Sequence, residues 1–111
     1  MVRIDRGVAE RLADTMFALS TTSRVQILAA LMNGPRTVSD LTERLGMEQS
    51  AVSHQLRVLL DNSLVRVERA GRQRMYSLYD EHVVTLMEEA VRHVQQRTRG
   101  RLGRRVRSAG E

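Results

Sequence analysis

Apolar residues recur along most of the 111-residue chain at intervals of three and four, the spacing that gathers side chains on one face of a helix. These stripes predict helices over residues 6–18, 22–32 and 80–96, and a pair of helices within residues 37–61. Residues 64–78 instead alternate apolar and polar positions on either side of Ala70-Gly71, which predicts a β-hairpin. The predicted fold is mainly α with a small β-hairpin.

The second helix of the 37–61 pair has two contrasting faces. Val52, Leu56 and Leu59 form an apolar stripe, and the opposite face carries small hydroxyls, an amide, an imidazole and a guanidinium. The residues of that outer face are Gln49, Ser50, Ser53, His54 and Arg57. Small hydroxyls let a helix sit deep in a DNA groove, while Gln and Arg can hydrogen-bond base edges or phosphates. The alternative is an ordinary solvated face, although such faces more often carry Glu and Lys.

A shorter helix precedes this one. The segment from Thr37 to Asp40 has the form of a capping box, and Leu41 and Leu45 give the helix an apolar side. Gly46 is expected to end the helix, because glycine tolerates the left-handed conformation found at helix ends. Two short helices joined by a glycine-containing turn predict a helix-turn-helix, whose second helix reads the major groove.

The predicted hairpin carries Arg69, Arg72 and Arg74 around its tip, with no acidic residue among them. A hairpin that directly follows a reading helix is typical of a wing, and arginines at its tip would hold neighbouring phosphates. The alternative is a hairpin whose charged tip only favours solubility. Together with the preceding segment, the pattern predicts a winged helix-turn-helix.

The charge is unevenly distributed along the chain. The net charge is +5, and residues 97–111 account for it with six Arg and one Glu, while residues 1–96 are neutral overall. Residues 1–96 are therefore predicted to form one DNA-binding and dimerisation domain, followed by a basic, disordered tail over residues 97–111. That tail either adds salt-sensitive affinity for DNA or has no role.

With no Cys, no signal peptide and no apolar run long enough to cross a membrane, a cytoplasmic protein is expected.

The last predicted helix, residues 80–96, has more apolar surface than a small domain needs. Its apolar positions are Val83, Val84, Leu86, Met87, Ala90, Val91 and Val94. A second copy of the chain is the expected occupant, so we predict a homodimer formed through the first and last helices.

The same helix carries His82 and His93, eleven residues apart. They project from one face but stand about 16 Å apart along the axis, too far to share one metal ion. In an antiparallel pair of these helices, His82 of one chain would meet His93 of the other, with Asp80 beside His82. The predicted metal ligands are Asp80, His82 and His93. The alternative is that Asp80 only caps the helix and the two histidines are solvated.

Taken together, these motifs over residues 8–96 resemble the ArsR/SmtB family of metal-responsive winged-helix regulators. The resemblance is carried by four stretches: 19–28, 46–60 with its Ser-x-x-Ser-His core, 69–72 and 76–78. Residues 46–59 and 76–80 are especially similar to nickel- and cobalt-sensing members. The resemblance implies a metal site across the paired terminal helices. At its fourth ligand position this chain has Gln96, where the family has His or Glu. Glu89 or a water molecule could serve as the fourth ligand in its place.

Nickel is the metal that the resemblance favours, while nitrogen and oxygen ligands also suit zinc and cobalt. We therefore expect a homodimer that binds a double-stranded, inverted-repeat operator under metal control. A second reading keeps DNA binding but has no metal sensing, so the protein acts constitutively or with a partner protein. A third is a protein- or RNA-binding module driven by its basic tail. An enzyme is not expected, because the sequence shows no nucleophile–base set, phosphate loop or paired carboxylates.

Overall fold

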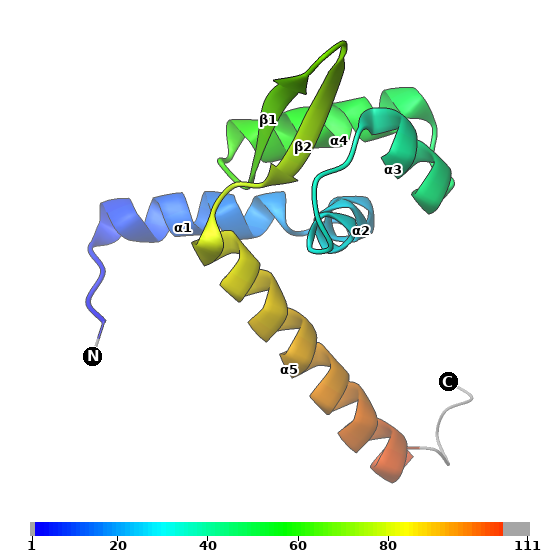
Figure 1. Ribbon diagram of the computed structural model, residues 1–111. Helices are drawn as coiled ribbons and strands as arrows, with labels where there is room; N and C mark the ends of the chain where they lie inside the picture. Colours follow the sequence, from blue (N-terminus) through cyan, green and yellow to red (C-terminus); the bar gives the residue numbers. More distant parts are fainter. Residues whose placement is uncertain (1, 106–111) are drawn as a thin grey trace.

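The computed structural model describes residues 2–105, with side chains described as far as Arg97. These residues form five helices and one antiparallel hairpin (Figure 1). The elements are α1 (Arg6–Ala18), α2 (Thr22–Leu31), α3 (Val38–Leu45), α4 (Gln49–Asp61), β1 (Val65–Ala70), β2 (Gln73–Leu78) and α5 (Glu81–Arg105). The prediction of a mainly α fold with a small hairpin is confirmed.

The helix boundaries follow from short polar side chains and one glycine. Thr21 Oγ1 accepts the backbone N–H of Arg24 at 3.3 Å, and Thr37 Oγ1 accepts that of Asp40 at 3.1 Å. Each contact satisfies a donor that the first turn of a helix leaves free. Gly46 ends α3 with φ at 64°, the left-handed conformation that lets the chain turn sharply into α4.

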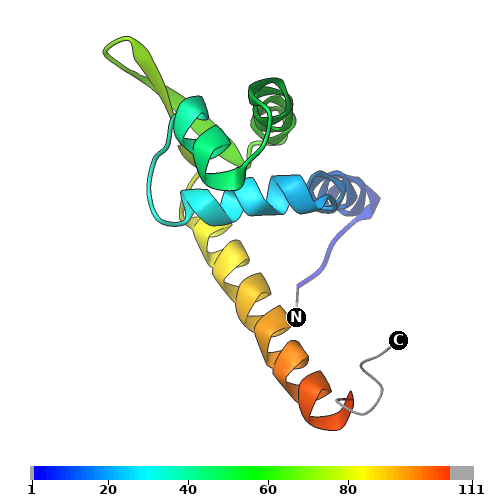
Figure 2. The same ribbon diagram turned by 90° about the vertical axis from the view of Figure 1, so that its right-hand side faces the viewer.

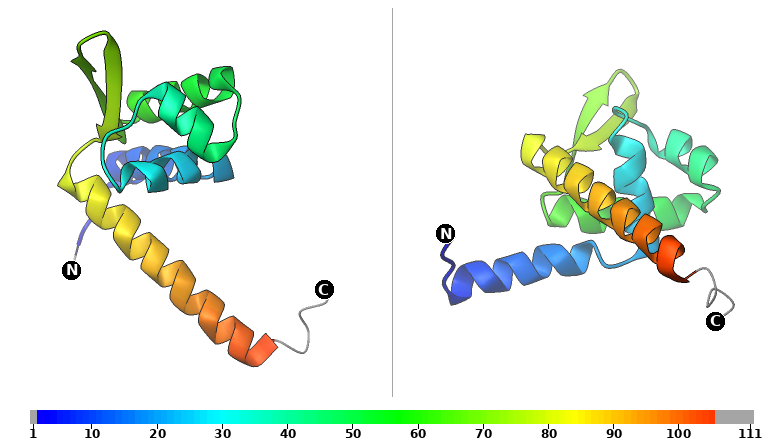
Figure 3. Two further views of the ribbon diagram at one scale, coloured as in Figure 1. Left: turned by 45° about the vertical axis from the view of Figure 1, so that its right-hand side comes forward. Right: turned by 90° about the horizontal axis from the view of Figure 1, so that it is seen from below.

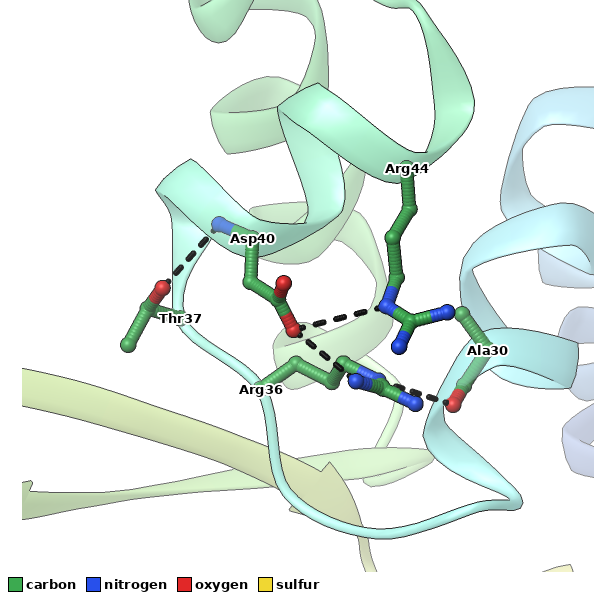
Figure 4. Close-up of polar contacts among 5 residues, drawn as sticks. All are labelled: Ala30, Arg36, Thr37, Asp40 and Arg44. Atoms are coloured by element: carbon green, nitrogen blue, oxygen red, sulfur yellow. Dashed lines mark hydrogen bonds and ion pairs between the residues drawn. The ribbon is translucent and has the colours of Figure 1, made fainter.

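Asp40 does not complete the predicted capping box, and that prediction was wrong in this half. Its carboxylate lies 3.0 Å from Nη1 of Arg36 and 3.6 Å from Nε of Arg44 (Figure 4). Arg36 also donates from Nε to the carbonyl oxygen of Ala30 at 3.4 Å. Asp is one methylene shorter than the Glu of a capping box, and two arginines compete for it. The Thr37 half of the cap remains, and the acidic side chain instead ties the α2–α3 connection to α3.

The core lies between α2, α3, α4 and the base of the hairpin. Its largest fully buried side chains are Ile27, Leu28, Leu41, Val52, Leu56, Leu59 and Val65. The first turns of α5 add Val83 and Met87, which are 7% and 4% exposed. This packing holds the inner stripe of α4 and leaves the rest of that helix outside.

The hairpin is anchored to the helix-turn-helix by its backbone. Its strands pair from Val65 opposite Leu78 to Ala70 opposite Gln73. Arg36, just before α3, forms an antiparallel bridge with Tyr76, with N–H···O distances of 2.9 and 2.8 Å. The wing therefore has a fixed base, while its tip projects away from the helices on the side opposite to α5 (Figures 1 and 2).

Helices α1 and α5 extend beyond the core (Figures 1 and 3). The radius of gyration is 16.5 Å, against about 13 Å for a compact chain of this length. The backbone of α5 continues through Arg105, whereas the end predicted from the sequence was residue 96. The added segment contains Gly100 and Gly103, which disfavour helix, but it has no Pro and several Arg, which favour helix. The division into residues 1–96 and a tail remains a prediction, and residues 106–111 lie outside the described part. No helix in the described part is long and apolar enough to cross a membrane.

Candidate DNA interface and metal site

Helix α4 presents all five predicted reading residues to solvent. Its inner stripe is buried, with Val52 and Leu59 at 0% and Leu56 at 1% exposure. The exposed residues of the outer face are Gln49, Ser50, Ser53, His54 and Arg57. Helices α3 and α4 pack together across the short turn at residues 46–48, which confirms the helix-turn-helix. The contacts of these five side chains with DNA remain a prediction, and their common exposure on one face supports it.

Three exposed arginines surround the tip of the wing. Arg69 and Arg74 are direct partners across the two strands, and Arg72 lies in the turn. Among the described residues none of the three forms an ion pair, whereas Arg66, nearer the base, lies 3.6 Å from an acidic neighbour. Like charges placed opposite one another destabilise a hairpin, so a bound anion would relieve the repulsion. The arrangement therefore suits a phosphate of the DNA backbone.

One residue pair beside the reading face was not anticipated from the sequence. Arg24 is only 7% exposed, and its Nη1 donates to Oε1 of Gln55 on α4 at 2.8 Å. Its Nε and Nη2 donate to the carbonyl oxygens of Ala18, at 2.6 Å, and Phe17, at 3.4 Å. One feature of the sequence could have indicated the buried position of Arg24: it lies one turn before Leu28, on the apolar side of its helix, where charged residues are rare. Its partner 31 residues away could not be read from spacing.

The start of α5 brings together two of the three predicted metal ligands. Oδ2 of Asp80 lies 3.4 Å from Nδ1 of His82, while Oδ1 accepts the N–H groups of His82 and Val83 at 3.0 and 3.2 Å. Desolvation raises the pKa of Asp80, but the hydrogen bonds from Val83 and His82 and the nearby imidazole charge outweigh it and lower this pKa. An ionised carboxylate beside an exposed imidazole is a donor pair that fits a divalent metal.

His93 is not part of this pair within one chain. It lies eleven residues further along α5, about 16 Å away along the axis. The described residues contain no group of three or more His, Asp or Glu side chains close enough to share a metal ion. Glu89, one turn before His93, is held 2.7 Å from Arg92, and Gln96 is exposed. One chain therefore supplies two separate halves, and the complete site remains a prediction that needs a second chain.

Comparison with known proteins gives close matches. Residues 21–67, which include α2, α3 and α4, match the family described as "Bacterial regulatory protein, arsR family". The chain is 56% identical over 90 residues to the HTH-type transcriptional regulator NmtR of Mycobacterium tuberculosis, covering 81% of this chain and 75% of that protein. It is 40% identical over 88 residues to a transcriptional repressor SmtB homolog of Synechocystis, covering 79% and 67% of the two chains.

Solved structures agree with the sequence matches. The solution structure of apo-NmtR superposes with a TM-score of 0.72 and 52% identity, over 86% of this chain and 81% of that one. A homodimeric winged helix-turn-helix DNA-binding domain, Mb0332 of Mycobacterium bovis, gives a TM-score of 0.75 and 28% identity, over 86% and 90%. The winged fold is thus confirmed, and the relatives are transcriptional regulators rather than enzymes, as predicted. The chain belongs to the ArsR family of bacterial regulatory proteins and is a DNA-binding transcriptional regulator.

Proposed function

We propose that this regulator is a cytoplasmic homodimer whose binding to a double-stranded, inverted-repeat operator is controlled by a divalent metal. Nickel is the expected metal, with zinc and cobalt as alternatives. The observation that carries the proposal is the pairing of Asp80 with His82 at 3.4 Å, on a helix that also bears His93 and an uncovered apolar face. The metal ligands and the dimer contact thus share one element.

The apolar side chains of α1 and α5 support a second copy of the chain as the dimer partner. Large apolar side chains left exposed on these helices are Val8, Leu12, Met16, Phe17 and Val94. A groove of about 420 Å³ runs between the start of α2 and α5, lined chiefly by Leu19, Val25, Met87, Ala90, Val91 and Val94. Exposed apolar surface of this extent marks an interaction site. A two-fold pairing would cover it on both subunits, and one structural relative is homodimeric.

That pairing would also complete the metal site. If α5 runs antiparallel to its copy, Asp80 and His82 of one subunit lie next to His93 of the partner subunit, and symmetry creates a second, equal site. A bound metal would supply a cross-link between the subunits. Gln96, Glu89 or water would fill a fourth position, and Glu89 would first have to leave Arg92, 2.7 Å away.

The connection between α5 and the wing offers a route from metal to DNA. Only two residues separate Leu78, at the end of β2, from Glu81, at the start of α5. The dimer contact therefore determines where the two wings and reading helices stand. Those helices must enter successive major grooves about 34 Å apart. If metal favours a dimer geometry in which this distance is wrong, metal binding lowers the affinity for DNA. By thermodynamic linkage, DNA binding then lowers the affinity for metal by the same factor. The family resemblance favours release of DNA by metal.

Operator binding with and without metal tests the proposal. An inverted repeat would be selected from a random duplex pool by the chelator-treated protein, and its affinity then measured with chelator, Ni²⁺, Co²⁺ and Zn²⁺ in turn. We expect at least one metal to change the affinity of the wild type by roughly 5- to 150-fold. His93→Ala should bind the operator normally without metal and lose this response, whereas Glu88→Gln, at an exposed position of α5 outside the apolar groove, should keep it. If His93→Ala binds nickel as well as the wild type, the proposed site is wrong.

A second candidate is a winged-helix regulator that does not sense metal and acts constitutively or with a partner protein. Gln96 favours it, because an amide oxygen stands where the family resemblance implies an imidazole or carboxylate. Equal operator affinity with chelator and with each of the three metals would establish this candidate in place of the first.

A further inference from the structure

Arg24 is the charged residue that the described part of the chain buries most deeply, at 7% exposure. Its guanidinium reaches acceptors on two other helices. It donates to the carbonyl oxygens of Ala18 and Phe17, at 2.6 and 3.4 Å, and to Oε1 of Gln55, at 2.8 Å. Burying a charge is costly unless it is hydrogen-bonded, so these contacts are what keep the side chain inside. Arg24 on α2 therefore joins the end of α1 to the reading helix α4.

The orientation of the Gln55 amide follows from its partner. Arginine only donates, so the amide must turn its oxygen toward Arg24. The core contacts of α4 are apolar and come chiefly from Val52, Leu56 and Leu59, with Leu60 packed beside them. Apolar contacts have no preferred direction, so they allow the helix to roll slightly about its axis. Gln55 lies about 100° around the helix from Leu56, and a hydrogen bond at that position opposes such rolling.

We propose that Arg24 is a positioning residue for DNA reading. Through Gln55 it fixes the rotation of α4 relative to α1, and with it the direction in which Ser53 and Arg57 face. This inference rests on the proposed function, in which the outer face of α4 reads base sequence. Base readout needs side chains placed to within a fraction of an ångström, whereas phosphate contacts carry no sequence information. Loss of the link should therefore reduce discrimination between sequences more than it reduces general affinity for DNA.

Two variants of similar size separate this role from other roles of Gln55. Gln55→Glu keeps an oxygen acceptor for Arg24, and Gln55→Met keeps the length of the side chain but removes the acceptor. The probes are the inverted-repeat duplex selected by the wild type and a scrambled duplex of equal composition, both at one salt concentration. The readout is the Kd for the scrambled duplex divided by the Kd for the selected duplex, so a high ratio means strong discrimination between sequences. The added negative charge of Gln55→Glu weakens electrostatic binding to both duplexes and largely cancels in the ratio.

Gln55→Met should lower the ratio on the order of tenfold, the size expected for one hydrogen bond to a charged group, and Gln55→Glu should change it by less than about twofold. Arg24→Lys should behave like Gln55→Met, because an ammonium cannot serve the α1 carbonyls and Gln55 together. Unfolding temperatures of all variants are measured alongside, and binding is compared well below the lowest of them.

An unchanged ratio for Gln55→Met would overturn the inference. So would an equal or larger loss for Gln55→Glu, which would show that Gln55 acts through its own amide group, as in a direct contact with DNA, and not as an acceptor for Arg24. These failures are distinct from failure of the proposed function: a wild-type protein that selects no sequence at all would refute DNA reading, whereas a selected operator with an unaltered ratio in the variants refutes only the role of Arg24.

Discussion

Shortening Leu12 tests whether α1 lies in the subunit interface. Within one chain Leu12 is 45% exposed, so nearly half of its surface is left for a partner to cover. Full burial of a leucine side chain contributes about 1.5–3 kcal/mol, so the uncovered part is worth roughly 1 kcal/mol per subunit and roughly 2 kcal/mol per symmetric dimer. Leu12→Ala should therefore raise the dimer dissociation constant on the order of 30-fold. Sedimentation or light scattering over a concentration series measures this constant.

Val67→Ala is the matched control for that experiment. Val67 is an apolar residue of similar exposure, 38%, but it lies on β1 of the wing, outside the predicted dimer contact. It should leave the dimer dissociation constant unchanged, and thermal unfolding of both variants reports any damage to the subunit fold. A Leu12→Ala protein that dimerises as tightly as the wild type would exclude α1 from the subunit interface, and a wild type that stays monomeric throughout the series would exclude the dimer.

Three further predictions concern DNA, the fold and pH. Arg72→Ala should weaken binding to operator and scrambled DNA alike and reduce the slope of log K against log salt by about 0.9. Arg57→Ala should instead reduce the difference in binding free energy between operator and scrambled DNA by about 1–3 kcal/mol. An unchanged salt slope for Arg72→Ala would exclude Arg72 from phosphate contact. Ser63 has φ at 54°, so Ser63→Gly should raise the free energy of unfolding in urea by about 0.5–1 kcal/mol, and a decrease would show that the side chain has another role. Lowering the pH from about 8 to about 6 should weaken nickel binding in calorimetry, because His82 and His93 bind metal only when neutral, and a pH-independent affinity would point to other ligands.

Features set by neighbours in the sequence were predictable, because their physics is local. The Thr37 cap, the Gly46 turn and the apolar stripe through Leu56 each depend on residues a few positions apart. The change to alternating polarity after residue 64 likewise marked the hairpin. These local rules were enough to give the order of elements and the exposed face of the reading helix.

The side-chain contacts that could not be predicted depend on the three-dimensional arrangement of the folded chain. The contact from Arg24 to Gln55 spans 31 residues, and no spacing rule links the two positions. Asp40 had two sets of possible partners, the backbone N–H of Thr37 and the guanidinium groups of Arg36 and Arg44. The folded chain favours the second set, because Arg44 lies one turn further along α3 and the α2–α3 connection brings Arg36 to the same carboxylate (Figure 4).

The candidate metal site shows the same division. Asp80 and His82 meet because they share one turn at the start of α5, and the capping role of Asp80 was visible in its position. His93 stands three turns away, so in the proposed site its partner ligands would come from another subunit. That part of the proposed site would be a property of the dimer, so neither the local sequence nor a single chain could show it.

If each metal site is shared between two subunits, mixing two variants that cannot bind metal on their own should restore nickel binding. His82→Ala and His93→Ala would each be unable to bind nickel tightly alone, because every site in either dimer lacks one imidazole. After equal amounts are unfolded and refolded together, half of the dimers should be mixed, and each mixed dimer has one site with both imidazoles intact. Nickel binding should then return to about one quarter of the wild-type capacity. A mixture that binds no better than the separate variants, or tight binding by either variant alone, would contradict it.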